Sequence, residues 1–126
     1  MHALVADDDE LNRTMLRRML TRIGWSVDEV TSGKAAVDAC ERTYYDLVLL
    51  DICMPGMTGH EAARLITRNH ESRPEPRSKR PSLVAVTGTD KTNTEDFASF
   101  DGYLQKPFML VELTACLDSL PSGQDC

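Results

Sequence analysis

The chain has 126 residues, a net charge of −6 and a pI near 5.0. This length predicts one domain with a real hydrophobic core, and the acidic balance gives no general electrostatic reason to bind nucleic acid. No stretch approaches the roughly 18 consecutive apolar residues of a membrane span, and because Met1 and His2 lead straight into the first predicted strand we expect no signal peptide. We therefore expect a cytoplasmic protein, or the cytosolic part of a larger one.

The cysteines argue against a zinc site or a disulfide framework. Cys40, Cys53, Cys116 and Cys126 are widely spaced and form no CxxC pair. The simplest interpretation is three small thiols in or near the core, with a fourth on the C-terminal tail.

Strands and helices alternate from the start of the chain. The apolar run at 3–6 predicts a strand, and apolar residues at three- and four-residue spacing predict a helix over about 11–23. Gly24 follows at the usual position after a helix end. A short strand is then predicted at 26–30 and a second helix at 33–42.

The middle of the chain repeats this alternation. The third strand is predicted at 46–50, and the segment 54–59, with Pro and two Gly, predicts a loop. A third helix at about 60–69 is followed by a solvated, proline-containing connector at 71–81. The fourth strand is predicted at 82–86.

The last third of the chain begins with a polar segment, 88–101, that has little apolar periodicity. Thr92 and Glu95 have capping-box spacing, which predicts a short fourth helix near 93–99. A fifth strand at 102–105 and a fifth helix at about 109–120 complete the pattern.

This alternation predicts an α/β fold, a flavodoxin-like three-layer sandwich with helices on both faces of a five-stranded parallel sheet. Strand order 2-1-3-4-5 places strands 1 and 3 side by side at a topological switch point. We expect one domain over 1–121 and a C-terminal tail over 122–126.

Four of the apolar runs end in residues suited to phosphoryl transfer. They lead into Asp7 and Asp8, into Asp51, into Thr87 and into Lys106. Because parallel strands present their carboxyl ends at one edge of the sheet, these side chains are expected to line one crevice.

Crowded carboxylates repel one another unless a cation joins them, and oxygen-only ligands favour Mg²⁺. Asp51 directly follows a run of four apolar residues and needs a compensating partner. A carboxylate in that position can form an aspartyl phosphate. The residues other than Asp51 also have plainer explanations: a favourable helix start for the acidic run, an ordinary strand end for Thr87, and a surface turn for Lys106.

Four stretches together resemble the receiver domain of the two-component response-regulator family, from residue 3 to about 120. They read VADDDELNR, LLDICMPGMTG, VAVTG and DGYLQKPF in this order. The residue patterns of the first two stretches are most similar to those of receivers in hybrid histidine kinases.

The resemblance implies that Asp51 accepts a phosphoryl group from a phosphohistidine on a histidine kinase or a histidine-phosphotransfer protein. It implies that Mg²⁺, for which Mn²⁺ can substitute, is ligated by Asp8, Asp51 and the backbone carbonyl of Cys53, with Asp7 binding through water. The domain would promote only its own phosphorylation and dephosphorylation, and would not be an enzyme in a wider sense. It would be a monomer or weak dimer, with no direct nucleic-acid or membrane contact.

The resemblance also implies a conformational switch. Lys106 would pair with the phosphoryl group, Thr87 would move to hydrogen-bond it, and Tyr103 would turn inward as Thr87 moves. Gly88 would leave room for the phosphoryl group, and the Lys106–Pro107 peptide bond would be cis. The segment from Thr87 to Lys106 is shorter than usual for the family by about one helical turn, so the fourth helix should be shortened.

Two alternatives stay open at this point. A degenerate receiver would act only as a protein-interaction module, although such a domain would normally lack the acceptor Asp or the Lys. A haloacid-dehalogenase-like phosphatase would carry its nucleophile in the first acidic motif and an acidic pair late in the chain, which this sequence lacks.

Overall fold

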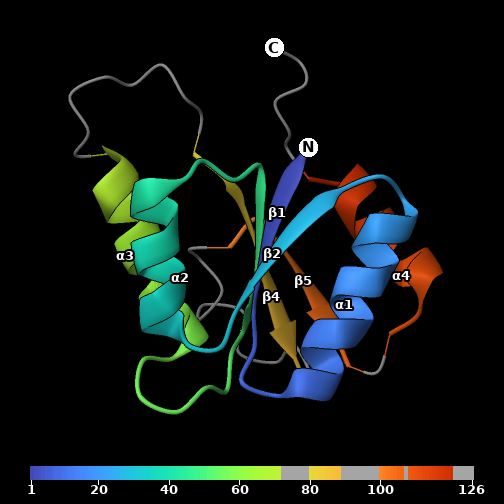
Figure 1. The fold of residues 1–126 in the computed structure, drawn as a ribbon, viewed down its shortest axis with the longest axis horizontal. Coiled ribbons are helices and arrows are strands. Elements are labelled where there is room, and N and C mark those ends of the chain that lie inside the picture. The colour runs from blue at the N-terminus through green and yellow to red at the C-terminus, as the bar shows by residue number, and fades with distance from the viewer. Residues whose placement is uncertain (72–79, 89–99, 107, 121–126) are drawn as a thin grey trace.

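A single parallel sheet organises the protein. The computed structural model describes residues 1–71, 80–88, 100–106 and 108–120. The strands lie in the order β2-β1-β3-β4-β5, all parallel, which confirms the predicted topology (Figure 1). Their bounds are β1 (His2–Ala6), β2 (Ser26–Val30), β3 (Leu47–Asp51), β4 (Ser82–Thr87) and β5 (Gly102–Gln105).

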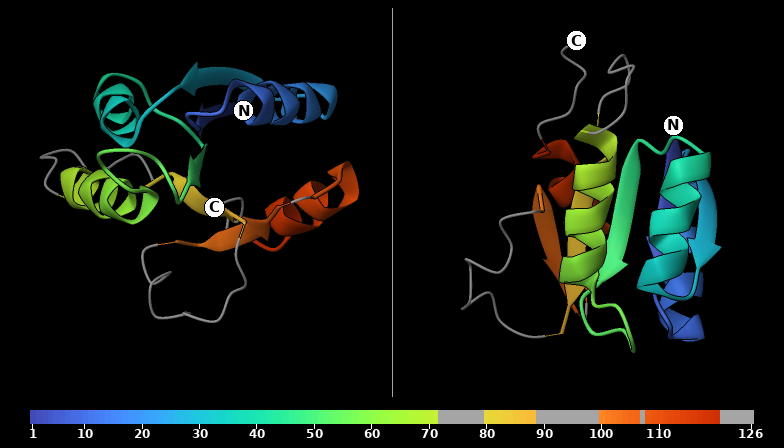
Figure 2. Two further views of the ribbon diagram at one scale, coloured as in Figure 1. Left: turned by 90° about the horizontal axis from the view of Figure 1, so that it is seen from below. Right: turned by 90° about the vertical axis from the view of Figure 1, so that its left-hand side faces the viewer.

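The described residues form four helices, which cover both faces of the sheet. They are α1 (Glu10–Arg22), α2 (Gly33–Arg42), α3 (Gly59–Glu71) and α4 (Leu110–Asp118). Helices α2 and α3 lie on one face and α1 and α4 on the other, which gives the predicted three layers (Figure 2). Within the described ranges no helix is long and apolar enough to cross a membrane.

The predicted elements agree with the observed ones within two residues at each end. Asp51 and Thr87 are the last residues of their strands rather than the first residues after them, because each still has a partner on the neighbouring strand. The label α4 belongs to the fifth predicted helix. The fourth predicted helix, the Lys106–Pro107 peptide bond and the 122–126 tail lie outside the described residues.

The core explains why the strands are almost entirely apolar. Alternate side chains of a strand point to opposite faces, so a sheet covered on both sides needs apolar residues throughout. In β3, Val48 and Leu50 pack with α2 and α3, whereas Leu47 and Leu49 pack with α1 and α4. The two half-cores fix the strands, and therefore the polar residues at their carboxyl ends.

Candidate functional site

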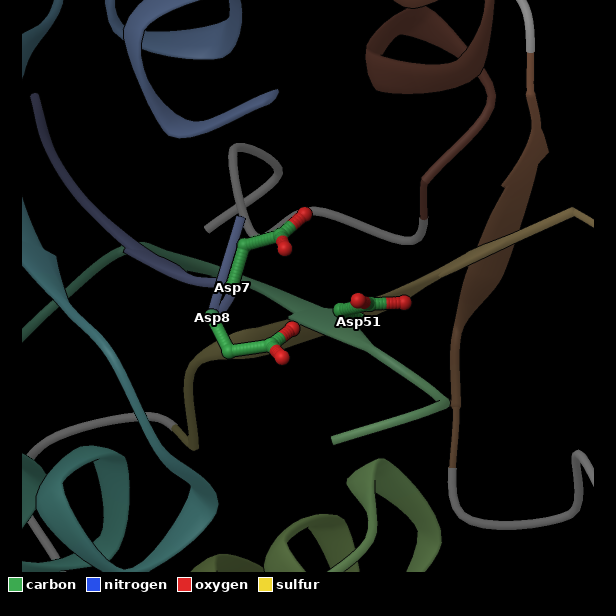
Figure 3. Close-up of side chains that lie close together, drawn as sticks. All are labelled: Asp7, Asp8 and Asp51. Atoms are coloured by element: carbon green, nitrogen blue, oxygen red, sulfur yellow. The ribbon is translucent and has the colours of Figure 1, made fainter. Parts of the chain in front are cut away.

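Three carboxylates gather where β1 and β3 end. The chain leaves β1 through Asp7 and Asp8, and the neighbouring β3 ends at Asp51. One carboxylate oxygen from each residue lies within 4.8 Å of the other two, and Figure 3 shows the three groups beside one another. Asp7 and Asp51 are buried, while Asp8 is exposed. The predicted convergence is confirmed for these three side chains.

Asp7 is held by the backbone around it. Its N–H donates to the Val30 carbonyl at 3.2 Å, and its Oδ1 accepts from the Asp9 N–H at 2.9 Å. The second carboxylate oxygen, Oδ2, is buried without a hydrogen-bond partner in the described part of the chain. A buried, unsatisfied carboxylate oxygen is costly, and a cation or a metal-bound water would satisfy it.

Asp51 lies in surroundings that disfavour its charged form. Burial, followed by the nearby charge of Asp7, raises its pKa from 3.8 to about 6, against the opposing effects of Lys106 and the Cys53 N–H. The Cys53 N–H donates to Oδ1 at 3.3 Å. Two buried carboxylates so close together repel each other, and a divalent cation would relieve that repulsion. Oxygen ligands with open positions fit Mg²⁺, so the residues present suit the metal that the sequence predicts.

Lys106 supplies the positive side of the site. Its Nζ lies 3.6 Å from Asp51 Oδ1 and 3.8 Å from Asp7 Oδ2. Its backbone N–H donates to the Thr87 carbonyl at 2.7 Å, which joins the ends of β4 and β5. The lysine side chain is flexible, so its ammonium group can move from the two carboxylates to an anionic group that becomes bonded to one of them.

The remaining predicted residues lie at or near the same edge. Thr87 is buried at the end of β4, and a Cβ added at Gly88 would meet no heavy atom of the described residues within 4 Å. Tyr103 is half-buried and pairs with Ala85 of β4. Ala85 precedes Thr87 by two residues, so the two side chains lie on the same face of the sheet, with Ala85 further from the carboxyl edge. Cys53 is exposed rather than near the core, because β3 has already ended and the chain turns outward into a loop.

The loop after β3 returns to the site through a glycine. The Gly59 N–H donates to the Ile52 carbonyl at 3.2 Å. A Cβ built on Gly59 would lie 2.5 Å from the Asp51 carbonyl oxygen. The start of α3 therefore lies directly against the backbone that carries Asp51.

Arg13 is a site neighbour that the sequence pattern did not single out. Its Nη1 donates to the Asp7 carbonyl at 2.8 Å, and its side chain is only 16% exposed. It belongs to the first stretch that carried the family resemblance, but nothing in its helical spacing distinguishes it from Arg17 or Arg18.

Comparison with known proteins decides the family. The model of the response regulator receiver domain matches residues 3–118. The chain belongs to the response regulator receiver domain family. This is the regulatory phosphoacceptor family of two-component signalling, so the match decides against the haloacid-dehalogenase-like alternative.

Known receivers support this assignment in sequence and in structure. The chain is 36% identical over 127 residues to the aerobic respiration control sensor protein ArcB of Escherichia coli K12, covering 99% of this chain and 16% of that protein. The receiver domain of sensor histidine kinase PA1611 from Pseudomonas aeruginosa, solved with a magnesium ion in its active site cleft, has a TM-score of 0.79 at 30% identity over 94% and 95% of the two chains.

A second solved structure agrees. Response regulator protein TrrA from Thermotoga maritima, in complex with Mg²⁺ and BeF, has a TM-score of 0.80 at 27% identity over 93% of this chain and 96% of that one. This receiver domain therefore shares its fold with receivers of both hybrid kinases and response regulators. The matched region covers 16% of the length of ArcB.

Proposed function

We propose that this receiver domain accepts a phosphoryl group on Asp51 from a phosphohistidine of a histidine kinase or histidine-phosphotransfer protein. The observation that carries the proposal is the placement of the Asp51 carboxylate, with Lys106 Nζ 3.6 Å away and two further carboxylates beside it. A carboxylate oxygen of Asp51 forms the new bond to phosphorus as the P–N bond breaks, and the imidazole leaves with the electron pair.

Asp8, Asp51 and the backbone carbonyl of Cys53 would hold Mg²⁺ directly, and Asp7 would bind it through water. Support comes from the oxygen-only donor set, from the unsatisfied Asp7 Oδ2, and from the magnesium ions in the PA1611 and TrrA structures. When bound, the metal neutralises charge on the transferring group. Mn²⁺, another divalent ion that accepts oxygen ligands, would substitute.

The other site residues would respond to the phosphoryl group. Lys106 would shift from the two carboxylates to the new phosphoryl oxygens, and the Thr87 hydroxyl would move to hydrogen-bond them. Gly88, whose missing Cβ would meet no heavy atom of the described residues within 4 Å, would leave room for the group. Tyr103, on the same strand pair, would turn inward into the space that Thr87 vacates. The signal would then be a shift in population between two arrangements.

Wider properties follow as predictions. The receiver unit would span residues 1–121, promote only its own phosphorylation and dephosphorylation, and act as a monomer or weak dimer on the cytosolic side. Neither nucleic acid nor a membrane would be a direct partner, in keeping with the net charge of −6. The cis geometry of the Lys106–Pro107 bond stays a prediction.

Phosphoryl uptake is measurable by intact mass after incubation with acetyl phosphate and Mg²⁺. We expect the wild-type chain to gain one phosphoryl group and to lose that gain when the metal is chelated. The Asp51→Asn variant should gain none, because the amide is not a nucleophile. An unmodified wild-type chain with donor and metal present would point to the degenerate interaction module instead.

The proposed role of Asp8 as a metal ligand can be tested with a matched control at the next position, Asp9. Asp8→Asn should remove most of the thermal stabilisation by Mg²⁺, which amounts to about 1.4 kcal/mol at roughly ten times the dissociation constant. Asp9→Asn removes the same charge, but the Asp9 side chain caps α1 by accepting from the Leu11 N–H, a role that Asn fulfils equally well. Differential scanning calorimetry with and without Mg²⁺ measures both, and equal losses in the two variants would contradict this ligand assignment.

A further inference from the structure

We infer that Arg13 is a positioning residue that fixes the acidic segment (residues 7–9) for metal binding without contacting the metal or the phosphoryl group. The inference rests on the proposed function of the site. It concerns the turn between β1 and α1, which presents Asp7 and Asp8 to Asp51.

Arg13 binds the acidic segment at both of its ends. Its Nη1 donates to the Asp7 carbonyl at 2.8 Å, and its backbone N–H donates to the Asp9 carbonyl at 3.0 Å. A hydrogen bond from a charged donor is about twice as strong as a neutral one, and this guanidinium is largely shielded from water. One residue of α1 therefore closes a ring around the three aspartates.

The guanidinium is itself anchored to the sheet. Its Nε lies 3.4 Å from Glu29 Oε1, and Arg17 Nε lies 2.6 Å from the other oxygen of the same carboxylate. The next residue of β2, Val30, accepts the Asp7 N–H at 3.2 Å. Both polar groups of the Asp7 backbone are thus held, the N–H by β2 and the carbonyl by Arg13.

This anchoring determines where the second carboxylate oxygen of Asp7 lies. Oδ1 is occupied by the Asp9 N–H at 2.9 Å, so Oδ2 alone remains, buried and 3.8 Å from Lys106 Nζ. If the Asp7 carbonyl lost its donor, the peptide could rotate, and both Asp7 Oδ2 and the following Asp8 carboxylate would leave their positions beside Asp51.

Positioning and simple electrostatics predict opposite results for the loss of Arg13. Arg13 is a cation near an acidic cluster, so removing its charge would strengthen Mg²⁺ binding if charge alone mattered. Loss of positioning would weaken binding, as substitution of groups that orient metal ligands does by about 10- to 100-fold. The sign of the change in affinity separates the two.

The test compares Arg13→Ala, Arg13→Lys and Arg17→Ala with the wild-type chain. Isothermal calorimetry gives the Mg²⁺ dissociation constant, and NMR hydrogen exchange on the metal-free protein reports on the Asp7 and Asp9 amides. We expect Arg13→Ala to weaken Mg²⁺ binding by about tenfold or more and to accelerate exchange at both amides. Arg13→Lys, which keeps a donor for the Asp7 carbonyl, should recover part of each effect.

Arg17→Ala is the matched control, since it removes an ion pair to the same Glu29 without touching the acidic segment. Its Mg²⁺ affinity and its Asp7 and Asp9 exchange should equal those of the wild-type chain. Unchanged or tighter Mg²⁺ binding in Arg13→Ala, or an equal loss in Arg17→Ala, would overturn the inference. If the wild-type chain bound no Mg²⁺, the proposed function would fall, and unchanged amide exchange in Arg13→Ala would separately refute the positioning role.

Discussion

The Asp51→Asn variant should be more stable than the wild-type chain at neutral pH when no divalent metal is present. Burial and the neighbouring Asp7 raise the pKa of Asp51 from 3.8 to about 6, so ionising this carboxylate is unfavourable in the folded chain. Asn has almost the same shape, carries no charge and can still accept from the Cys53 N–H. A residue proposed to be essential for function therefore destabilises the metal-free fold.

The direction of the pH dependence follows from the raised pKa. Between about pH 4 and pH 6 the folded chain keeps a proton on Asp51 that the unfolded chain has released, so wild-type stability falls as the pH rises through this window. Above it the full cost is present, at most about 3 kcal/mol for a shift of this size. The advantage of the variant should thus be largest above pH 6 and vanish below pH 4.

Urea unfolding at pH 7.5 and pH 4, in the presence of a chelator, measures this difference. Asp38→Asn provides a control, because that side chain is 46% exposed and its carboxylate pairs with Lys34 on the same helix. The effect of this substitution should stay within about 0.5 kcal/mol at both pH values. Added Mg²⁺ should reduce the difference in the free energy of unfolding between Asp51→Asn and the wild-type chain. The same stability difference at both pH values would show that Asp51 is not electrostatically strained.

Gly59→Ala should lower the free energy of unfolding by about 1–3 kcal/mol through overpacking. The added Cβ would lie 2.5 Å from the Asp51 carbonyl oxygen and 3.0 Å from the Ile52 Cα, and backbone atoms cannot simply rotate away. Within a helix, alanine is more favourable than glycine by about 1 kcal/mol. A net loss of stability in this variant, at the first residue of α3, would therefore indicate a steric effect. Because the displaced backbone carries Asp51, phosphoryl uptake should slow as well.

Chemical denaturation of Gly59→Ala beside Gly88→Ala separates steric from general glycine effects. The Cβ of Gly88→Ala would meet no heavy atom within 4 Å in the part of the chain that the structure describes, so this variant should unfold near the wild-type midpoint. It serves as a control for stability only, since Gly88 lies beside the proposed phosphoryl site. Equal stability of the two variants would mean that Gly59, at the start of α3, is not in close contact with the Asp51 backbone.

Much of the fold could be predicted from the sequence because the signals are local and repeated. The apolar run 47–50 predicts a strand buried on both faces, which is observed as β3, and helical spacing predicts α1 within about one residue at each end. The convergence of Asp7, Asp8 and Asp51 followed from parallel topology alone, without any contact information.

What could not be predicted depends on three-dimensional contacts. No pattern shows that Arg13 folds back to the Asp7 carbonyl rather than facing solvent, or that Gly59 lies against Asp51. Burial of Cys53 was expected from residue type, but the end of β3 turns it outward. The size of the pKa shift of Asp51 depends on how deeply the side chain is buried and on how closely it approaches Asp7, and the sequence predicts neither quantity.

Locating the modified residue tests the central proposal most directly. Borohydride reduces an aspartyl phosphate to homoserine, which tandem mass spectrometry of peptides identifies by position. After acetyl phosphate and Mg²⁺, we predict homoserine at position 51 in the wild-type chain, and none when the metal or the donor is left out. Homoserine at position 7 or 8, or a phosphoryl group that resists reduction and lies on a hydroxyl side chain, would contradict the assignment of Asp51 as the acceptor.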